Sequence, residues 1–355
     1  MQLWLWLRWI LWQAWVSCWR VVRHRGHEVA AQEGIARRKQ AWRIVRLALG
    51  WCIPPGEAYR FGLYRHPERA LEFVYEHEVP AYHALRSRPL GRTRASIALL
   101  QDKYALAQAL SARGVPMVAS GACLPARSRG QPLAGLMAPW DRVFCKTRSG
   151  QQGLGAFVAW RTADGLRGRA LAGCDLVDAA AVEAAWTRLL NLDDALIQPC
   201  LANHPLLAPL SFNDDAITVR LISEWRGATL ACRCAVLQVP TSRDERTDHT
   251  RYTGLPVATA SGRVQPWPRP EALPSRTRAA MDRLWALIPA GLLVPDWPAL
   301  VAGSYRAHQC FPDLWGIAWD WVIAPDGPIL LEGNAGWGAA IPQILAGGLL
   351  ADDRN

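Results

Sequence analysis

The stretch from Asp320 to Asn334 reads D-W-V-I-A-P-D-G-P-I-L-L-E-G-N and predicts a β-hairpin. Two apolar runs flank Pro325-Asp326-Gly327, which has residue types typical of tight turns. Because side chains two apart on a strand point the same way, Glu332 and Asn334 share a face. Together with Asp320 they form a set of two carboxylates and an amide carbonyl, which suits Mg²⁺ bound with substrate phosphates. Alone, the stretch also fits an ordinary surface hairpin with a solvated acidic end.

Lysine is rare in this chain. Of its 40 basic residues only three are lysines, and these are Lys39, Lys103 and Lys146. A lysine ammonium is compact, whereas arginine presents a planar fork, so the remaining lysines indicate positions that need an ammonium. Lys146 ends a predicted strand, and the loop from Ser149 to Gly155 follows it. Gly150, Gly153 and Gly155 would let backbone N–H groups approach phosphate oxygens, although the loop matches neither a Walker A nor a dinucleotide-binding motif.

Lys103 lies in a predicted amphipathic helix. Apolar residues from Leu99 to Leu110 recur at helical spacing, and Gly114 and Pro116 end the helix. A lysine on such a helix is commonly just solvated, so a phosphate-binding role for Lys103 needs support from the other segments.

The order of these segments resembles the ATP-grasp superfamily, as in D-alanine–D-alanine ligases. The chain is most similar to the branch called sugar-transfer-associated ATP-grasp proteins, which is related to α-L-glutamate ligases. Three segments carry that closer resemblance, which covers roughly residues 95 to 345: Ala195 to Leu201, Asn203 to Ile222, and Leu314 to Asn334. It implies an α+β fold in which two lobes with antiparallel sheets clamp ATP behind a helical N-terminal region.

The resemblance also implies a role for each matching residue. Lys103 and Lys146 would contact ATP phosphates, and the loop containing Ser149, Gly150, Gly153 and Gly155 would cover them. The segment with Gln198, Cys200 and Leu201 would read adenine through its backbone, although Pro199 lacks a donor N–H. Arg220 and Arg233 would bind the γ-phosphate or an acyl-phosphate intermediate. Asp320, Glu332 and Asn334 would hold one or two Mg²⁺ ions, which Mn²⁺ could replace.

The implied activity is ATP-dependent coupling of a small carboxylate to an amine or hydroxyl acceptor, in the biosynthesis of a cell-surface polysaccharide or peptide precursor. Phosphoryl transfer needs positioning and charge neutralisation, so no Ser, Cys or His is assigned as a nucleophile. A non-catalytic or regulatory ATP-binding protein and an ATP-dependent phosphotransferase are the alternatives. The segment from Ser242 to Gly254 departs from close relatives and leaves the acceptor open. His249 within it reads as a solvated loop residue or as a base.

We expect three parts: a basic, Trp-rich helical region at 1–95, an N-lobe at 96–200 and a C-lobe at 201–355. Residues 1–100 contain 16 basic and 7 acidic residues, whereas the whole chain has a net charge of +10, so the basic character is concentrated there. The chain opens with a dense set of tryptophans, namely Trp4, Trp6, Trp9, Trp12, Trp15 and Trp19.

Two interpretations of this N-terminal region stay open. It forms either an amphipathic helix on an anionic membrane surface or a helix docked on the catalytic core. Nucleic-acid binding is disfavoured, because no binding motif accompanies the charge. A secretory signal fits poorly, since no charge precedes the apolar run. The nine scattered cysteines suggest no disulfide framework, so we expect a cytoplasmic protein. If the N-terminal region binds a membrane, the protein would lie on the inner face of that membrane.

Overall fold

The computed structural model describes residues 2–9, 12, 15, 17–126, 128, 131–149, 155–171, 175–212, 214–243, 250–268, 273 and 275–351. The chain forms two compact units. Unit 1 comprises Met1–Leu85, Pro266–Arg283 and Gly336–Asn355, and unit 2 comprises Arg86–Gln265 and Leu284–Ala335. The domain boundaries expected at 95/96 and 200/201 stay predictions.

Unit 1 is helical. Its elements are α1 (Gln2–Trp9), α2 (Cys18–Glu33), α3 (Arg37–Trp51), α4 (Pro55–Arg60), the 3₁₀ helix η2 (Pro67–Glu72) and α12 (Ala340–Ala346). Two further helices, α5 (Val79–Ser87) and α10 (Ser275–Leu287), have residues in both units. The α2–α3 hairpin is held by buried Gln40, whose amide donates to the Gly26 carbonyl over 3.2 Å and accepts from the Tyr59 hydroxyl over 2.8 Å.

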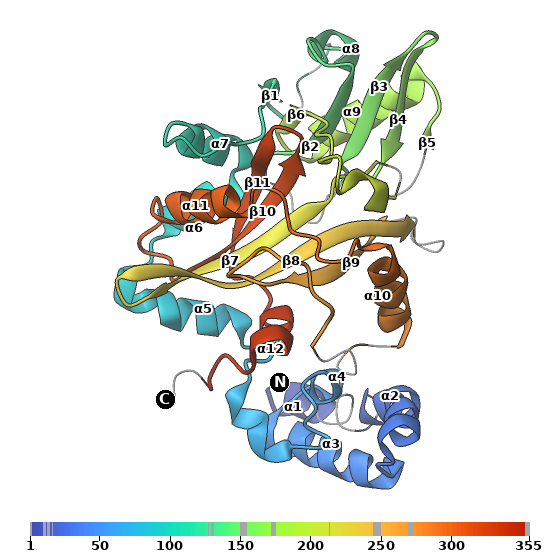
Figure 1. Ribbon diagram of the computed structural model, residues 1–355, viewed down its shortest axis with the longest axis vertical. Helices are drawn as coiled ribbons and strands as arrows, with labels where there is room; N and C mark the ends of the chain where they lie inside the picture. Colours follow the sequence, from blue (N-terminus) through green and yellow to red (C-terminus); the bar gives the residue numbers. More distant parts are fainter. Residues whose placement is uncertain are drawn as a thin grey trace. The chain divides into compact units, whose positions relative to one another are not determined.

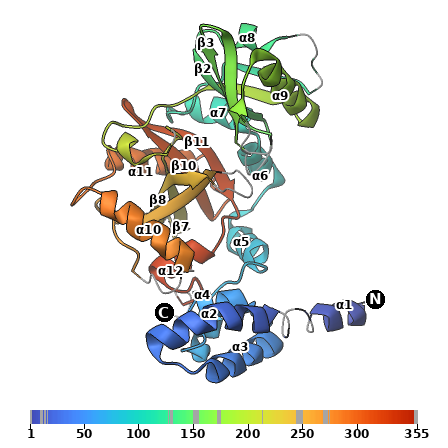
Figure 2. The ribbon, with the colours of Figure 1, turned by 90° about the vertical axis from the view of Figure 1, so that its right-hand side faces the viewer.

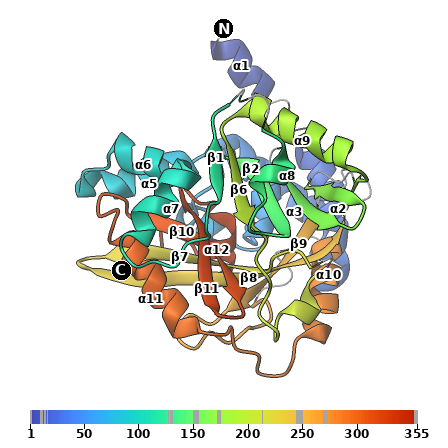
Figure 3. The same cartoon turned by 90° about the horizontal axis from the view of Figure 1, so that it is seen from above.

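Unit 2 contains two antiparallel sheets (Figure 1). The first has the order β1-β6-β2-β3-β4-β5. Its strands are β1 (Ala122–Leu124), β2 (Arg142–Thr147), β3 (Phe157–Thr162), β4 (Gly165–Ala170), β5 (Asp175–Leu176) and β6 (Ala195–Pro199). The helices α8 (Leu133–Leu136) and α9 (Ala179–Leu192) cover one face, where Trp186 and Leu189 join the sheet's core (Figure 3).

The second sheet has the order β11-β10-β7-β8-β9. Its strands are β7 (Thr218–Arg226), β8 (Thr229–Arg243), β9 (Thr250–Val257), β10 (Gly316–Ala324) and β11 (Gly327–Ala335). The remaining elements of unit 2 are η3 (Arg88–Leu90), α6 (Arg94–Gln101), α7 (Lys103–Ser111), η4 (Ala208–Leu210) and α11 (Trp297–His308). The α+β class expected from the sequence, with antiparallel sheets after a helical N-terminal region, is confirmed.

A buried hydrogen-bond chain supports one face of β10. The Trp319 indole N–H donates to Ser223 Oγ over 2.9 Å, and the Ser223 hydroxyl donates to Nδ1 of His308 over 2.7 Å. His308 Nε2 donates to the Leu314 carbonyl over 2.9 Å, because a carbonyl can only accept. Each side chain in this series of hydrogen bonds has its partner. The network therefore fixes Trp319 and, with it, the neighbouring Asp320 on the opposite face.

The turn and packing of the hairpin explain two of its glycines. The hairpin turns at Pro325-Asp326, and Gly327 has φ of +121°. Gly333 lies opposite Trp319 in the register, and a Cβ there would come within 2.4 Å of the indole. Glycine at this position therefore leaves room for the Trp319 indole on the covered face of the sheet.

Among the described residues, no helix is long and apolar enough to cross a membrane. The eight cysteines whose placement is described are all free thiols.

The buried histidine predicts a pH dependence of stability. Burial lowers the pKa of His308 from 6.5 to about 4, so at intermediate pH the unfolded chain binds a proton that the native chain does not. The contribution of this group to stability is therefore complete above the unfolded pKa and falls as pH drops from 6.5 towards 4. Between about pH 7 and pH 5 the wild type should lose roughly 2 kcal/mol more of its free energy of unfolding than the His308→Gln variant loses. Chemical denaturation at the two pH values measures this difference. The surface variant His24→Gln should show the same pH dependence as the wild type. If the free energy of unfolding changed equally with pH in all three proteins, His308 would not be its source.

Candidate active site

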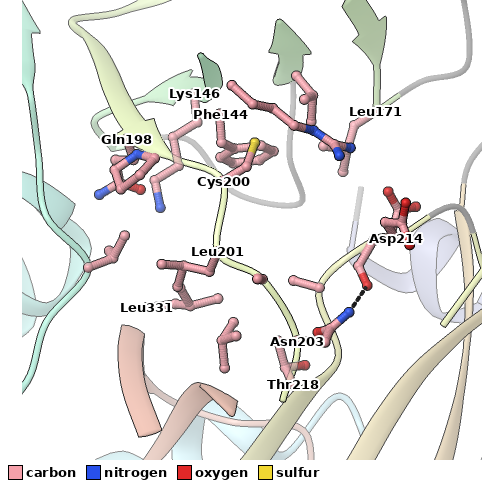
Figure 4. Close-up of a pocket in the computed structure, with 18 of the residues that line it drawn as sticks. Phe144, Lys146, Leu171, Gln198, Cys200, Leu201, Asn203, Asp214, Thr218 and Leu331 are labelled. Atoms are coloured by element: carbon pink, nitrogen blue, oxygen red, sulfur yellow. Dashed lines mark hydrogen bonds between the residues drawn. The ribbon is translucent and has the colours of Figure 1, made fainter. Parts of the chain in front are cut away.

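Strand alternation on β2 places Lys146 on the side away from the core. Val143 and Cys145 are buried beneath α9, whereas Phe144 and Lys146 face a cavity (Figure 4). Withdrawal from water lowers the pKa of the Lys146 ammonium to about 8. That value already includes the opposing effect of the Glu332 carboxylate and a smaller lowering by the nearby Lys103 ammonium. A polyanionic ligand bound beside this lysine would stabilise its charged form.

The register of three strands brings the predicted metal ligands together with Arg220. On β10, Asp320 lies opposite Glu332 of β11 on one side and opposite Arg220 of β7 on the other. Directly opposed residues of antiparallel strands point to the same face, so these three side chains share it. The register shifts after Asp320, because Trp321 lies opposite Leu330 and leaves Leu331 as a bulge that lines the cavity.

Arg220 and Asp320 form a bidentate ion pair. Arg220 Nε and Nη2 each donate to one carboxylate oxygen of Asp320 over 2.7 Å. The Asp320 side chain is 8% exposed and that of Arg220 is 40% exposed, so the carboxylate depends on this partner more than the guanidinium does. Burial raises the pKa of the Asp320 carboxyl, and Arg220 counteracts that rise.

Asn334 and Glu332 complete the cluster. The Asn334 amide Nδ2 donates to Asp320 Oδ2 over 3.2 Å and to Glu332 Oε1 over 3.3 Å. Glu332 also raises the pKa values of Arg220, Asp320 and Lys146 through its charge. The structure therefore brings one residue of the first sheet and four of the second into a single electrostatic cluster.

A second ion pair, which the sequence interpretation missed, holds Lys103 near Lys146. Arg148 donates to both carboxylate oxygens of Asp102 over 2.8 and 2.6 Å, and also to Asp194 over 3.1 Å. Asp102 caps α7 by accepting from the Ala105 N–H, and the Lys103 N–H donates to the Arg148 carbonyl over 3.2 Å. The only available signal was position: Asp102 precedes one lysine, and Arg148 follows the other by two residues.

The glycine-rich loop is described only at its two ends. Ser149 is exposed, and its N–H and hydroxyl both donate to the Asp193 carboxylate. At the other end Gly155 has φ of +72°, a backbone conformation that residues with a side chain adopt only with strain. Gly150 and Gly153 lie outside the described residues.

The cavity between the sheets of unit 2 has a volume of about 550 Å³, which is ample for a nucleoside. The predicted adenine-reading segment lines it with Gln198, Cys200 and Leu201. Gln198 is buried and donates to Ser120 over 3.2 Å, and the Cys200 N–H donates to the Arg142 carbonyl. In the described part of the chain no hydrogen bond reaches the Leu201 N–H, so this donor stays available to a ligand.

The cavity is also lined by Arg169, Asn203 and Asp215, none of which the sequence interpretation assigned to the site. Arg169 of β4 pairs with Asp215, and both side chains are largely buried. Asn203 holds the segment before β7 in place. Its amide donates to the Asp215 carbonyl over 3.0 Å and accepts from the Ile217 N–H over 2.7 Å (Figure 4).

Arg233 lies apart from the cluster. It occupies a bulge in β8, and its guanidinium binds Glu224, whose side chain is 2% exposed and also accepts from Arg226. The structure thus brings Arg220 to the predicted metal ligands and places the Arg233 guanidinium on a different carboxylate. His249 lies outside the described residues.

The donor set at Asp320, Glu332 and Asn334 fits a hard divalent cation, because it offers carboxylate and amide oxygens only. Among the described residues no group of three or more His, Cys, Asp or Glu side chains could hold a metal ion. The cluster supplies two carboxylates and one amide, which suits a cation that takes its other ligands from substrate phosphates and water.

The geometry predicts that Arg220 stabilises the site before any ligand binds. We expect Arg220→Gln to lower the free energy of unfolding by about 1–3 kcal/mol, because it leaves the Asp320 carboxylate buried without a cation. Adding Asp320→Asn in the same chain should recover part of the loss, since the charge is removed. Urea denaturation of the single and double variants measures both effects, and additive losses would contradict the coupling.

Residues 89–354 match the family described as sugar-transfer associated ATP-grasp. No protein of curated function matches the chain at a significant level.

Several solved structures are similar to part of it. A D-alanine-D-alanine ligase from Coxiella burnetii has 12% identity and a TM-score of 0.35, with 68% of this chain and 50% of that chain covered. A D-alanyl-alanine synthetase A from Vibrio cholerae has 9% identity and a TM-score of 0.45, with coverage of 72% and 61%. The VanG D-Ala:D-Ser ligase from Enterococcus faecalis has 10% identity and a TM-score of 0.42, with coverage of 72% and 58%. The chain therefore spans only 50–61% of the length of these proteins. The family match extends over most of the chain, which belongs to the sugar-transfer-associated ATP-grasp family.

Proposed function

We propose that this chain is an ATP-dependent ligase that couples a carboxylate to an amine or hydroxyl acceptor. One observation carries the proposal: Lys146, on the wall of the 550 Å³ cavity, interacts electrostatically with Glu332, which lies beside the Arg220–Asp320 pair. A cavity of nucleoside size that adjoins both cations and hard oxygen ligands suits a nucleoside triphosphate with Mg²⁺. Membership of an ATP-grasp family supports the same activity.

The cavity residues would orient ATP. The base would lie against Phe144, Leu201 and Leu331, with the Leu201 N–H as a backbone donor. Lys146 and Lys103 would neutralise phosphate charge in a site partly withdrawn from water, where such interactions are strong. Arg233 is not part of this proposal, because its guanidinium is bound to buried Glu224.

The cation would be held by Asp320, Glu332 and Asn334. Asn334 directs its Nδ2 at both carboxylates, so its amide oxygen faces away from them. Rotation of the amide by half a turn exchanges the two atoms and offers the oxygen instead. A bound Mg²⁺ would stabilise charge on the transferred phosphoryl group.

The proposed reaction has two steps. A carboxylate oxygen of the acid attacks the γ-phosphorus of ATP, the bond to the β–γ bridging oxygen breaks, and ADP leaves with that electron pair. The acceptor nitrogen or oxygen then attacks the acyl carbon and releases inorganic phosphate, while the acceptor loses a proton to solvent. Arg220 would bind the transferred phosphoryl group, because its side chain is 40% exposed and lies opposite Asp320, a proposed metal ligand. Acids and acceptors of cell-surface polysaccharide or peptide precursors are the proposed substrates.

A screen of small carboxylates with amine and hydroxyl acceptors tests the reaction type. Release of ADP and phosphate together with a condensed product in the mass spectrum supports a ligase. A phosphorylated product would instead show a phosphotransferase, and ATP binding without turnover across the screen would show a binding protein.

Substitution of the metal ligands predicts a selective loss of turnover. Glu332→Gln and Asp320→Asn should each reduce Mg²⁺-dependent ATP turnover by roughly 100-fold or more while the fold is retained, because charge stabilisation is lost. Asp326→Asn, on the exposed turn of the same hairpin, is the matched control and should keep wild-type turnover. Turnover near the wild-type level in both site variants would defeat the metal assignment.

The Asp102–Arg148 pair predicts an effect on ATP binding. We expect Arg148→Gln to raise the KM for ATP roughly tenfold, because the backbone link between the two lysines loses its support. Arg188→Gln, on the exposed face of α9, serves as the control. A KM unchanged by Arg148→Gln would show that Lys103 needs no such positioning.

A further inference from the structure

The α2–α3 hairpin of unit 1 displays large aromatic side chains to solvent. Trp19, Trp42 and Trp51 are 65%, 58% and 58% exposed, although the same hairpin buries Val22, Ile44 and Leu47. Figure 2 shows the two helices side by side. Because soluble monomers seldom expose several large aromatic groups on one short segment, the hairpin is a candidate interaction surface.

A groove of about 520 Å³ lies in the same hairpin. Its apolar lining comes from Trp15, Trp19 and Val22 on one side and from Ala41 and Val45 on the other. Three basic side chains also line it, namely Arg23, His27 and Arg37. The groove therefore combines an apolar floor with cationic groups, which matches an amphiphile with an anionic head.

All exposed ionic side chains between residues 17 and 51 are basic. They are Arg20, Arg23, Arg37, Arg38, Lys39 and Arg46. Both carboxylates in this segment form ion pairs: Glu28 pairs with Arg25 and Arg278, and Glu33 pairs with Arg65. The exposed surface of the hairpin is therefore complementary to an anionic partner.

Tryptophan and arginine are paired on this face. The Arg23 guanidinium lies 5.3 Å from the Trp19 ring centroid, and that of Arg46 lies 4.4 Å from the Trp42 ring centroid. At a membrane interface indoles lie at the level of the lipid headgroups, and guanidinium groups bind the phosphates. Each cation–π pair therefore holds a guanidinium group next to an exposed indole.

We propose that the α2–α3 hairpin binds the surface of a bilayer that contains anionic phospholipids. Exposed cations such as Arg23 and Arg46 would bind headgroup phosphates, and Trp19 and Trp42 beside them would insert among the headgroups. A second copy of the chain is a poorer occupant, because a symmetric dimer would place this cationic face against itself. The proposal concerns unit 1 and does not depend on the ligase activity.

Sedimentation of the full chain with vesicles tests the proposal. We expect binding to phosphatidylcholine vesicles that contain phosphatidylglycerol, at least roughly tenfold stronger than to phosphatidylcholine alone, since each basic residue near an anionic surface adds attraction. Added salt should weaken the binding, because it screens exposed charges.

Two double variants separate the charge from the aromatic contribution. Trp19→Ala with Trp42→Ala, and Arg23→Gln with Arg46→Gln, should each lower vesicle binding roughly tenfold. The controls are Trp285→Ala and the pair Arg167→Gln with Arg188→Gln, which lie on exposed parts of unit 2. Circular dichroism checks that the helices are retained.

Three outcomes would overturn the proposal. One is equal partition of the wild type to both vesicle types, and another is equal loss of binding in the control variants. The third is a concentration-dependent dimer in sedimentation velocity that disappears in the tryptophan variant, because it would assign the face to a second copy.

Discussion

The ion pair between Arg220 and Asp320 is the constraint on which the candidate site depends. Asp320 lies in the middle of β10, a strand whose residues are all buried, so its carboxylate needs a cation nearby. The cross-strand register supplies that cation from β7 and the second carboxylate, Glu332, from β11. Because the pair is bidentate, it also fixes the direction of both side chains.

The two sides of β10 do different work. On the covered side, Trp319, Ser223 and His308 form a fully paired hydrogen-bond chain, which keeps the strand in place. On the other side, Asp320 lies beside Glu332 and Asn334, the other two ligands of the proposed cation. A rigid strand with paired groups on one side is a suitable base for charged groups on the other.

Residue patterns in the sequence predicted much of the hairpin but only part of the site. Strand alternation and turn chemistry correctly predicted that Glu332 and Asn334 share a face and that the turn lies near Pro325. Alternation could not predict the bulge at Leu331, because a bulge depends on the partner strand. The pairs Asp102–Arg148 and Arg169–Asp215 each join residues 46 positions apart, and the chain has too many arginines and carboxylates for composition to select the partners. For the same reason, the sequence could not predict that Arg233 pairs with Glu224. The roles in ATP and Mg²⁺ binding stay predictions for every site residue.

A crystal structure with Mg²⁺ and a non-hydrolysable ATP analogue tests the central claim most directly. The account predicts the base in the cavity beside Leu201, the phosphates near Lys146 and Arg220, and the cation on Asp320, Glu332 and the Asn334 oxygen. A nucleotide bound elsewhere, or a cation that contacts neither carboxylate, would contradict it.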